Sequence, residues 1–143
     1  MVSLDDLRAA TGVAMTPTPV SQPTRRTNGV VARRCTFVSE DLRTNHIVTV
    51  EFSTGPVAVA VFRATSTAPT INQTPGMGSA PPRTVEHLPS VPGAAVVTGN
   101  NLSFVEANVV VSVISETNNE SDPDLSRNVA PVVADELRRT LRP

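Results

Sequence analysis

The sequence predicts an α+β fold, in which an antiparallel sheet of hairpins and a meander is packed by an N-terminal and a C-terminal helix. Val and Thr are abundant and gather in short alternating or apolar runs, which is typical of strands. Gly, Asn and Pro separate these runs, as expected for turns. An amphipathic helical pattern closes the chain, and 143 residues is the usual length of a single domain, here residues 1–143.

The first part of the chain is expected to hold a helix, a loop and a hairpin. Residues 3–10 predict a short helix with Ser3 as its N-cap, because a serine side chain can accept from the free amides of the first turn. Residues 15–29 are rich in Pro and Thr and lack periodicity, which indicates a loop. Strands over residues 30–39 and 46–53 then form an antiparallel hairpin.

The segment 56–65 fits either a buried strand or a helix. Its Val and Ala alternate as in a strand, whereas its first residue, a Pro, suits the first position of a helix. Ala58, Val61 and Phe62 share one helical face, and this spacing favours the helix. Residues 66–83 follow as a surface loop, poor in charge and rich in Ser, Thr, Pro and Gly.

The second part predicts a three-stranded meander. Strands are expected over residues 94–98, 102–105 and 109–115, with turns rich in Asn between them. The third run is nearly continuously apolar, which is typical of a central strand covered on both faces. Residues 116–124 are polar and acidic and indicate a loop.

The end of the chain predicts the main packing helix, over residues 125–141. Val129, Val133 and Leu137 recur at helical spacing and give the helix an apolar face. Pro131 is tolerated if the regular helix begins near Asn128, because the first turn of a helix needs no backbone donor.

Composition excludes several classes of function. The net charge is -1, from 12 basic residues and 13 acidic ones, which gives no bulk attraction to nucleic acid or to an anionic membrane. No apolar run approaches the roughly 18 residues of a transmembrane helix. The single cysteine, Cys35, is expected to be a buried strand residue; as a nucleophile it would need a base, for which His46 across the hairpin is the candidate.

The sequence predicts no catalytic, metal-binding or cofactor-binding residue. The two histidines, His46 and His87, lie too far apart in sequence for a recognisable metal motif. The acidic pairs are adjacent residues, which are usually solvated rather than opposed in a cleft. The Gly-Met-Gly of residues 76–78 lacks the third Gly and the Lys of a phosphate-binding loop, and no Gly-x-Ser-x-Gly occurs. A hydrolase is therefore the least favoured class.

Four arginines, a methionine and a histidine are the candidate binding residues. The arginines form a basic cluster without stacking aromatic residues, so nucleic acid is not predicted as a partner. They fit either a solvated strand edge or a contact with an anionic envelope component. We expect the binding groove between the sheet and residues 66–83. The candidates are Arg25, Arg26, Arg33, Arg34, Met77 and His87.

Three segments carry a resemblance to a known group of proteins. They are DDLRAATG at residues 5–12, RCTF at residues 34–37 and LPSVPGAA at residues 88–95. With the order of predicted elements, this pattern resembles the small extracytoplasmic lipoprotein domains of mycobacteria and other actinobacteria, the Lpp- and Lpq-type families of unknown function. The chain departs from the pattern at Phe37, where Trp or Tyr is common, and it lacks the second Cys and the lipidated Cys of those families.

The resemblance implies a non-enzymatic binding or sensing domain in the cell envelope. Its partner would be a lipid, another small molecule or an envelope protein, and a lipid anchor outside this chain would provide any membrane attachment. The resemblance also implies a truncated N-terminus and a lost disulfide partner for Cys35. If the chain is complete, the lack of a signal peptide predicts the cytoplasm instead. The alternative function is a structural or protein-interaction module that uses an exposed sheet edge.

Overall fold

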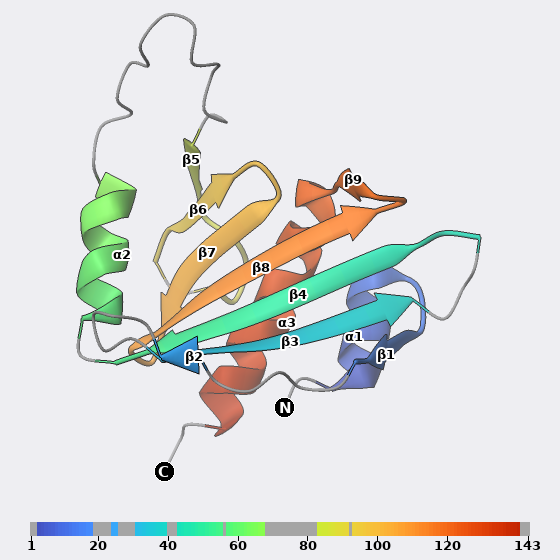
Figure 1. The fold of residues 1–143 in the computed structure, drawn as a ribbon, viewed down its shortest axis with the longest axis horizontal. Helices are drawn as coiled ribbons and strands as arrows, with labels where there is room; N and C mark the ends of the chain where they lie inside the picture. Colours follow the sequence, from blue (N-terminus) through green and yellow to red (C-terminus); the bar gives the residue numbers. More distant parts are fainter. Residues whose placement is uncertain are drawn as a thin grey trace, which may run out of the picture.

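The structure is a computed structural model that describes residues 3–18, 24–25, 31–39, 43–55, 57–67, 83–91 and 93–140. Within these residues, nine strands form one antiparallel sheet with three helices (Figure 1). The elements in chain order are α1 (Leu4–Thr11), β1 (Met15–Pro17), β2 (Thr24–Arg25), β3 (Val31–Ser39), β4 (His46–Thr54), α2 (Ala58–Thr67), β5 (Arg83–Glu86), β6 (Ala95–Thr98), β7 (Asn101–Glu106), β8 (Val109–Thr117), β9 (Glu120–Ser121) and α3 (Pro123–Thr140). The predicted α+β class is confirmed.

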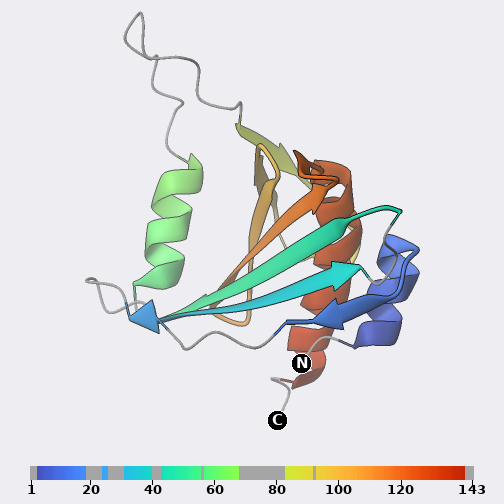
Figure 2. The same cartoon turned by 45° about the vertical axis from the view of Figure 1, so that its right-hand side comes forward.

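The sheet separates the helices into two layers. Its strand order is β1-β3-β4-β8-β7-β6-β5, with β2 also beside β3 and β9 beside β8. Helices α1 and α3 cover one face, and α2 stands on the opposite side (Figure 2). We call the first the inner face and the second the outer face. The predicted packing of one face by the two terminal helices is confirmed.

The main core lies on the inner face. Leu7 of α1 and Val129 and Val133 of α3 are fully buried against strand residues such as Val113 and Phe104. Side chains alternate between the faces of a strand, so every second residue of β4, β7 and β8 enters this core. Burial of each large apolar side chain contributes about 1.5–3 kcal/mol, which makes the inner face the main source of stability.

Strand β8 is the central strand, as its apolar run predicts. Val111 and Val113 are buried in the inner core, whereas Val110 is buried on the other face against Ala58 of α2. The predicted helix over residues 56–65 is also confirmed as α2, although its apolar stripe is unevenly covered. Ala58 is buried and Phe62 partly so, but Val61 is 46% exposed.

Helix α3 begins earlier than predicted. Asp122 caps it, with its Oδ1 accepting from the Leu125 amide at 3.1 Å, and Pro123 occupies the first helical position. The predicted loop over residues 116–124 is therefore wrong at both ends, because β8 extends to Thr117, β9 pairs with it and the helix follows directly.

The early start of α3 also places Pro131 inside an 18-residue helix, and the expectation of a start near Asn128 is wrong. Proline has no amide hydrogen, so the carbonyl of Arg127 lacks its usual helical donor. Residue Leu141, which the sequence includes in this helix, lies outside the described residues.

The two predicted loops are wrong in part. Residues 15–29 contain β1 and β2, which both pair with β3; a two- or three-residue strand has no periodicity of its own and forms because the long β3 offers an edge. Of residues 66–83, the first two end α2 and Arg83 begins β5. Residues 19–23, 26–30 and 68–82 lie outside the described part of the chain.

The predicted first helix and its N-cap are confirmed. Ser3 Oγ accepts from the Asp6 amide at 3.4 Å, and Gly12 adopts φ 80°, a left-handed conformation that suits glycine at a helix end. None of the helices in the described residues is long and apolar enough to cross a membrane.

Candidate functional site

Strand register places a row of polar side chains across the outer face. Arg34 of β3 lies opposite Glu51 of β4, Glu51 lies opposite Ser112 of β8, and Ser112 lies opposite Ser103 of β7. Directly opposed residues in an antiparallel pair point to the same face and lie close together. The four residues therefore form one continuous line, which we call the polar row.

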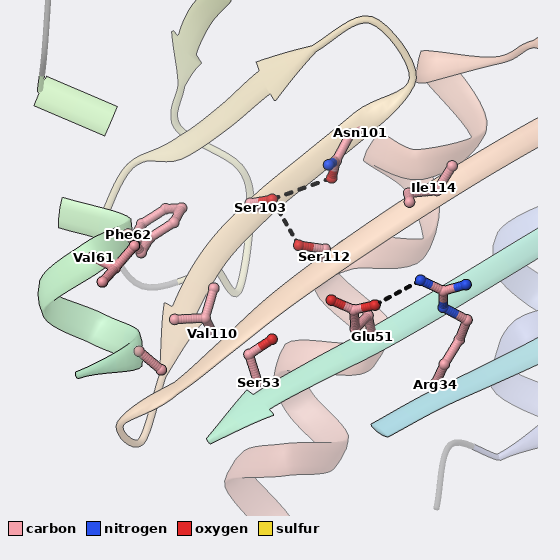
Figure 3. Close-up of a pocket in the computed structure, with 11 residues that line it drawn as sticks. Arg34, Glu51, Ser53, Val61, Phe62, Asn101, Ser103, Val110, Ser112 and Ile114 are labelled. Carbon is pink, nitrogen blue, oxygen red and sulfur yellow. Dashed lines mark hydrogen bonds and ion pairs between the residues drawn. The ribbon is translucent and has the colours of Figure 1, made fainter. Parts of the chain in front are cut away.

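The polar row is the floor of a groove between the outer face and α2 (Figure 3). The groove has a volume of about 400 Å³ and is open to solvent. This volume lies within the range of about 300–1,000 Å³ that is common for small-molecule sites. Its lining consists of Arg34, Glu51, Ser53, Ala58, Val61, Phe62, Asn101, Ser103, Val110, Ser112 and Ile114.

Hydrogen bonds hold the floor in place. Arg34 Nη2 donates to Glu51 Oε2 at 2.9 Å, and the Glu51 side chain is only 15% exposed. Ser103 Oγ donates to Asn101 Oδ1 at 3.2 Å. Because that bond uses the single hydroxyl hydrogen of Ser103, the 2.9 Å contact between Ser103 Oγ and Ser112 Oγ has Ser112 as its donor.

Two polar groups of the lining keep hydrogen-bonding capacity for a ligand. Within the described residues, Asn101 Nδ2 and the Ser53 hydroxyl have no hydrogen-bond partner, and both residues are only partly exposed. The first is a donor, and the second can both donate and accept. A molecule in the groove can therefore bond to them without breaking a bond of the protein.

The wall of the groove is apolar. Phe62 and Ala58 of α2 pack against Val110 of β8 in a small cluster that is separate from the main core. In Figure 3 the ring of Phe62 extends from α2 toward the sheet, above the side of the groove where Val110 lies. The groove thus has a polar floor and an apolar wall.

Of the predicted binding residues whose side chains the structure describes, only Arg34 lies in the groove. Arg34 lines it, whereas Arg33 is exposed and, as the next residue of β3, points to the opposite face. The predicted basic cluster is therefore not a single surface, since alternation along β3 divides these two side chains. His87 is exposed beyond the end of β5 and does not line the groove.

The remaining predicted residues cannot be placed. Arg25 belongs to β2, but its side chain, like Arg26 and Met77, lies outside the described part of the chain. The expected groove between the sheet and residues 66–83 is replaced, in the described residues, by a groove whose wall is α2.

The candidate pair of Cys35 and His46 is not formed. Cys35 lies opposite Val50 and packs at the margin of the main core, whereas His46 lies at the far end of β4 beside Thr117. The expectation that Cys35 is a buried apolar strand residue is confirmed in part, because it is only partly buried. The sequence separation of Cys35 and His46 does not predict whether they pair, because the hairpin register decides which residues face each other.

His46 belongs instead to a hydrogen-bonded chain that ends at the cap of α3. Thr117 Oγ1 donates to Asp122 Oδ2 at 2.6 Å, and His46 Nδ1 lies 2.9 Å from the same Thr117 oxygen. With its hydrogen used on Asp122, Thr117 accepts from His46 Nδ1–H. The hydroxyl stands between the imidazole and the carboxylate, whereas a catalytic triad needs the imidazole in the middle. These hydrogen bonds hold β8 against the start of α3, and they do not activate a nucleophile.

Away from the groove, an ion pair joins the edge of the sheet to α3. Arg127 donates from Nε and Nη2 to both carboxylate oxygens of Glu86, at 2.9–3.2 Å. These hydrogen bonds, with the charge of Arg127, lower the pKa of Glu86 below its usual value against the opposing effect of partial burial. The same bonds raise the pKa of Arg127. The pair fixes β5 on α3.

The described residues contain no group of three or more His, Cys, Asp or Glu side chains that could hold a metal ion. Comparisons with models of known families, with curated proteins and with solved structures gave no match for this chain.

Most groove residues carry no sequence signal. Ser103, Ser112 and Glu51 belong to three different strands, and isolated Ser or Glu residues on strands normally indicate a solvated face. Only the register between the strands, and the position of α2 above them, turns these residues into the floor of one groove. The one signal that could have helped was the apolar face of the predicted helix, which includes Phe62.

Proposed function

We propose that this chain is a binding or sensing domain of the cell envelope, without chemistry of its own, that holds a small molecule in the groove beneath α2. The observation that carries the proposal is the amphipathic groove itself, with the polar row as its floor and Phe62 in its wall. Sites for small molecules usually combine an apolar lining with a few fixed polar groups.

The hydrogen bonding of the floor favours binding over hydrolysis. Ser103 and Ser112 are hydrogen-bonded to each other, and Ser103 also donates to Asn101; within the described residues neither hydroxyl is hydrogen-bonded to a His, Asp or Glu. A nucleophilic hydroxyl needs a general base within hydrogen-bond distance. Groups held in this way can present a fixed pattern of donors and acceptors to a ligand.

Native mass spectrometry of protein purified from its host tests the binding function. Wild-type protein should carry an additional mass that is lost on denaturation. The variant Ser112→Phe places a bulky side chain on the groove floor and should lose that mass, while Val85→Phe, on the same sheet face but two strands away from Ser103, should keep it. Bound mass retained by Ser112→Phe would contradict the groove as the site.

The envelope setting is supported by the resemblance of the segments at residues 5–12, 34–37 and 88–95 to actinobacterial lipoprotein domains. Fractionation of host cells with an antibody against this chain tests it. The protein should appear in the envelope fraction; recovery in the cytoplasmic fraction alone would refute the setting and leave the groove untouched.

The exposed edge strand β5 favours a second candidate function, a protein-interaction module. Within the described residues β5 pairs with β6 alone, and its Val85 side chain is 59% exposed. An open edge can take an additional strand from a partner. Cross-linking in host cells should then be lost in Val85→Lys and retained in Ser112→Phe, and the opposite pattern would favour the groove.

A further inference from the structure

We propose that the groove selects a neutral, polyhydroxylated ring, such as a mono- or disaccharide. This inference rests on the proposed function of the groove and adds the chemical class of its ligand. It follows from three properties of the lining: its charge, the mixture of donors and acceptors on its floor, and the position of its apolar wall.

The charges of the lining cancel. Among the described residues that line the groove, the charged ones are Arg34 and Glu51, and their side chains are paired at 2.9 Å. A charged ligand would leave water without meeting an uncompensated charge of opposite sign, which makes its burial costly. Arg34 is 57% exposed at its end of the polar row, so solvent further screens its charge. The charge balance therefore favours a neutral ligand.

The floor offers donors and acceptors together. Asn101 Nδ2 donates, Glu51 and the Ser112 hydroxyl oxygen accept, and the Ser53 hydroxyl has capacity for both roles. A ligand that only accepts or only donates would leave part of this set unpaired. Ligand hydroxyls donate and accept at the same atom, so several hydroxyls on one ring match the set.

The apolar wall suits the C–H face of such a ring. Phe62 packs against the cluster of Ala58 and Val110 on the α2 side of the groove, next to the polar row. A sugar ring carries hydroxyls on its rim and C–H groups on its faces, so it can bond to the floor while it packs against Phe62. A linear alkyl chain would pack against the apolar wall, but it would leave the polar groups of the floor without hydrogen-bond partners.

NMR titration of the full chain with glucose, maltose and n-octyl glucoside tests the ligand class. We expect each to shift the backbone amides of Ser53, Ser103 and Ser112. Glucosamine, glucuronate and n-octyl phosphocholine serve as the cationic, anionic and non-sugar probes and should bind more weakly. Equal shifts with maltose and octyl glucoside would show that the ring is recognised whether it is free or carried on an alkyl chain.

Two variants locate the contacts. Ser53→Ala removes a hydroxyl that has no partner within the described residues, so the fold should persist. The loss of one ligand hydrogen bond should weaken sugar binding by about two- to tenfold. Thr98→Ala, which removes a hydroxyl from the same sheet face outside the groove, should leave the affinity unchanged.

The outcomes separate this inference from the function on which it rests. Binding of octyl phosphocholine or of a charged sugar at the groove, with none of glucose or maltose, would overturn the ligand class and keep the groove as a binding site. If no probe shifts the groove amides and the host protein carries no bound mass, the binding function itself fails. Unchanged sugar affinity in Ser53→Ala would overturn the assignment of the Ser53 hydroxyl as a ligand contact on the groove floor.

Discussion

Two valines of α3 test whether burial on the inner face stabilises this protein. Val129 is fully buried in the core, whereas Val132, on the same helix, is only partly buried. Replacing each with Ala makes the same chemical change in the same secondary structure. The comparison therefore isolates the depth of burial.

The expected magnitudes follow from the methyl groups removed. Val→Ala at position 129 loses two buried carbons, worth about 0.8 kcal/mol each. The cavity left behind adds to this, so Val129→Ala should lower the free energy of unfolding by about 2–3 kcal/mol. Val132→Ala should cost about 0.5–1 kcal/mol, because part of its side chain already contacts water. Both variants gain a few tenths of a kcal/mol in helix propensity, which cancels in the comparison.

Urea denaturation followed by circular dichroism measures both values. The midpoint should fall for each variant, with an unchanged slope if the unfolded state is the same. The difference between the two variants should be about 1–2 kcal/mol. Equal losses, or a larger loss for Val132→Ala, would refute the inner face as the main core.

Three further changes give distinct results. Pro131→Ala restores a donor for the Arg127 carbonyl and should raise the urea midpoint; a lower midpoint would show that the ring is needed for packing. Ser126→Ala removes a buried hydroxyl that contacts Ser115 Oγ at 2.9 Å and should cost about 1–3 kcal/mol by the same measurement. The pKa of Glu86 is lowered in the folded state, so its pairing stabilises fully above its unfolded pKa of roughly 4.3 and is lost as pH falls through the lower folded value. Glu86→Gln should therefore be destabilised at pH 7, and the gap to wild type should close at low pH.

The sequence predicts the elements whose signals are local. The apolar run of β8 indicates a central strand, and the spacing of Val129 and Val133 indicates the buried face of α3; both are confirmed. Ser3 and the Gly that ends α1 are caps, and caps depend on neighbouring residues alone. In each case the residues that carry the signal are the ones that form the contact.

The sequence fails where a partner far along the chain decides the structure. β1 and β2 exist because β3 offers them an edge, and nothing in their own residues alternates. The start of α3 was a different failure, because Asp122 followed by a proline is a local capping signal that the acidic character of the segment concealed.

The same contrast between local and long-range signals holds for the groove residues. Arg34 was predicted as a binding residue for its charge, and the structure pairs it with Glu51 within the groove lining. The rest of the polar row depends on the offset between strands, which is fixed by turns and by burial on the opposite face. Its residues become neighbours only after the inner core has set that offset.

Helix α2 has a consequence for how the molecule opens. Among the described side chains, its apolar contact with the sheet is the small cluster around Ala58 and Val110. The chain leaves β4 for α2 through Gly55, whose φ of 129° is accessible to glycine alone. Detachment of α2 would expose few apolar side chains, so its amides should exchange with deuterium through a sub-global event of lower free energy than exchange in β8. A molecule that binds against Phe62 only while α2 is in place would stabilise the closed state, and it would therefore slow hydrogen exchange selectively in α2. Protection of this one helix would then report occupancy of the groove, even for a ligand that leaves global unfolding almost unchanged.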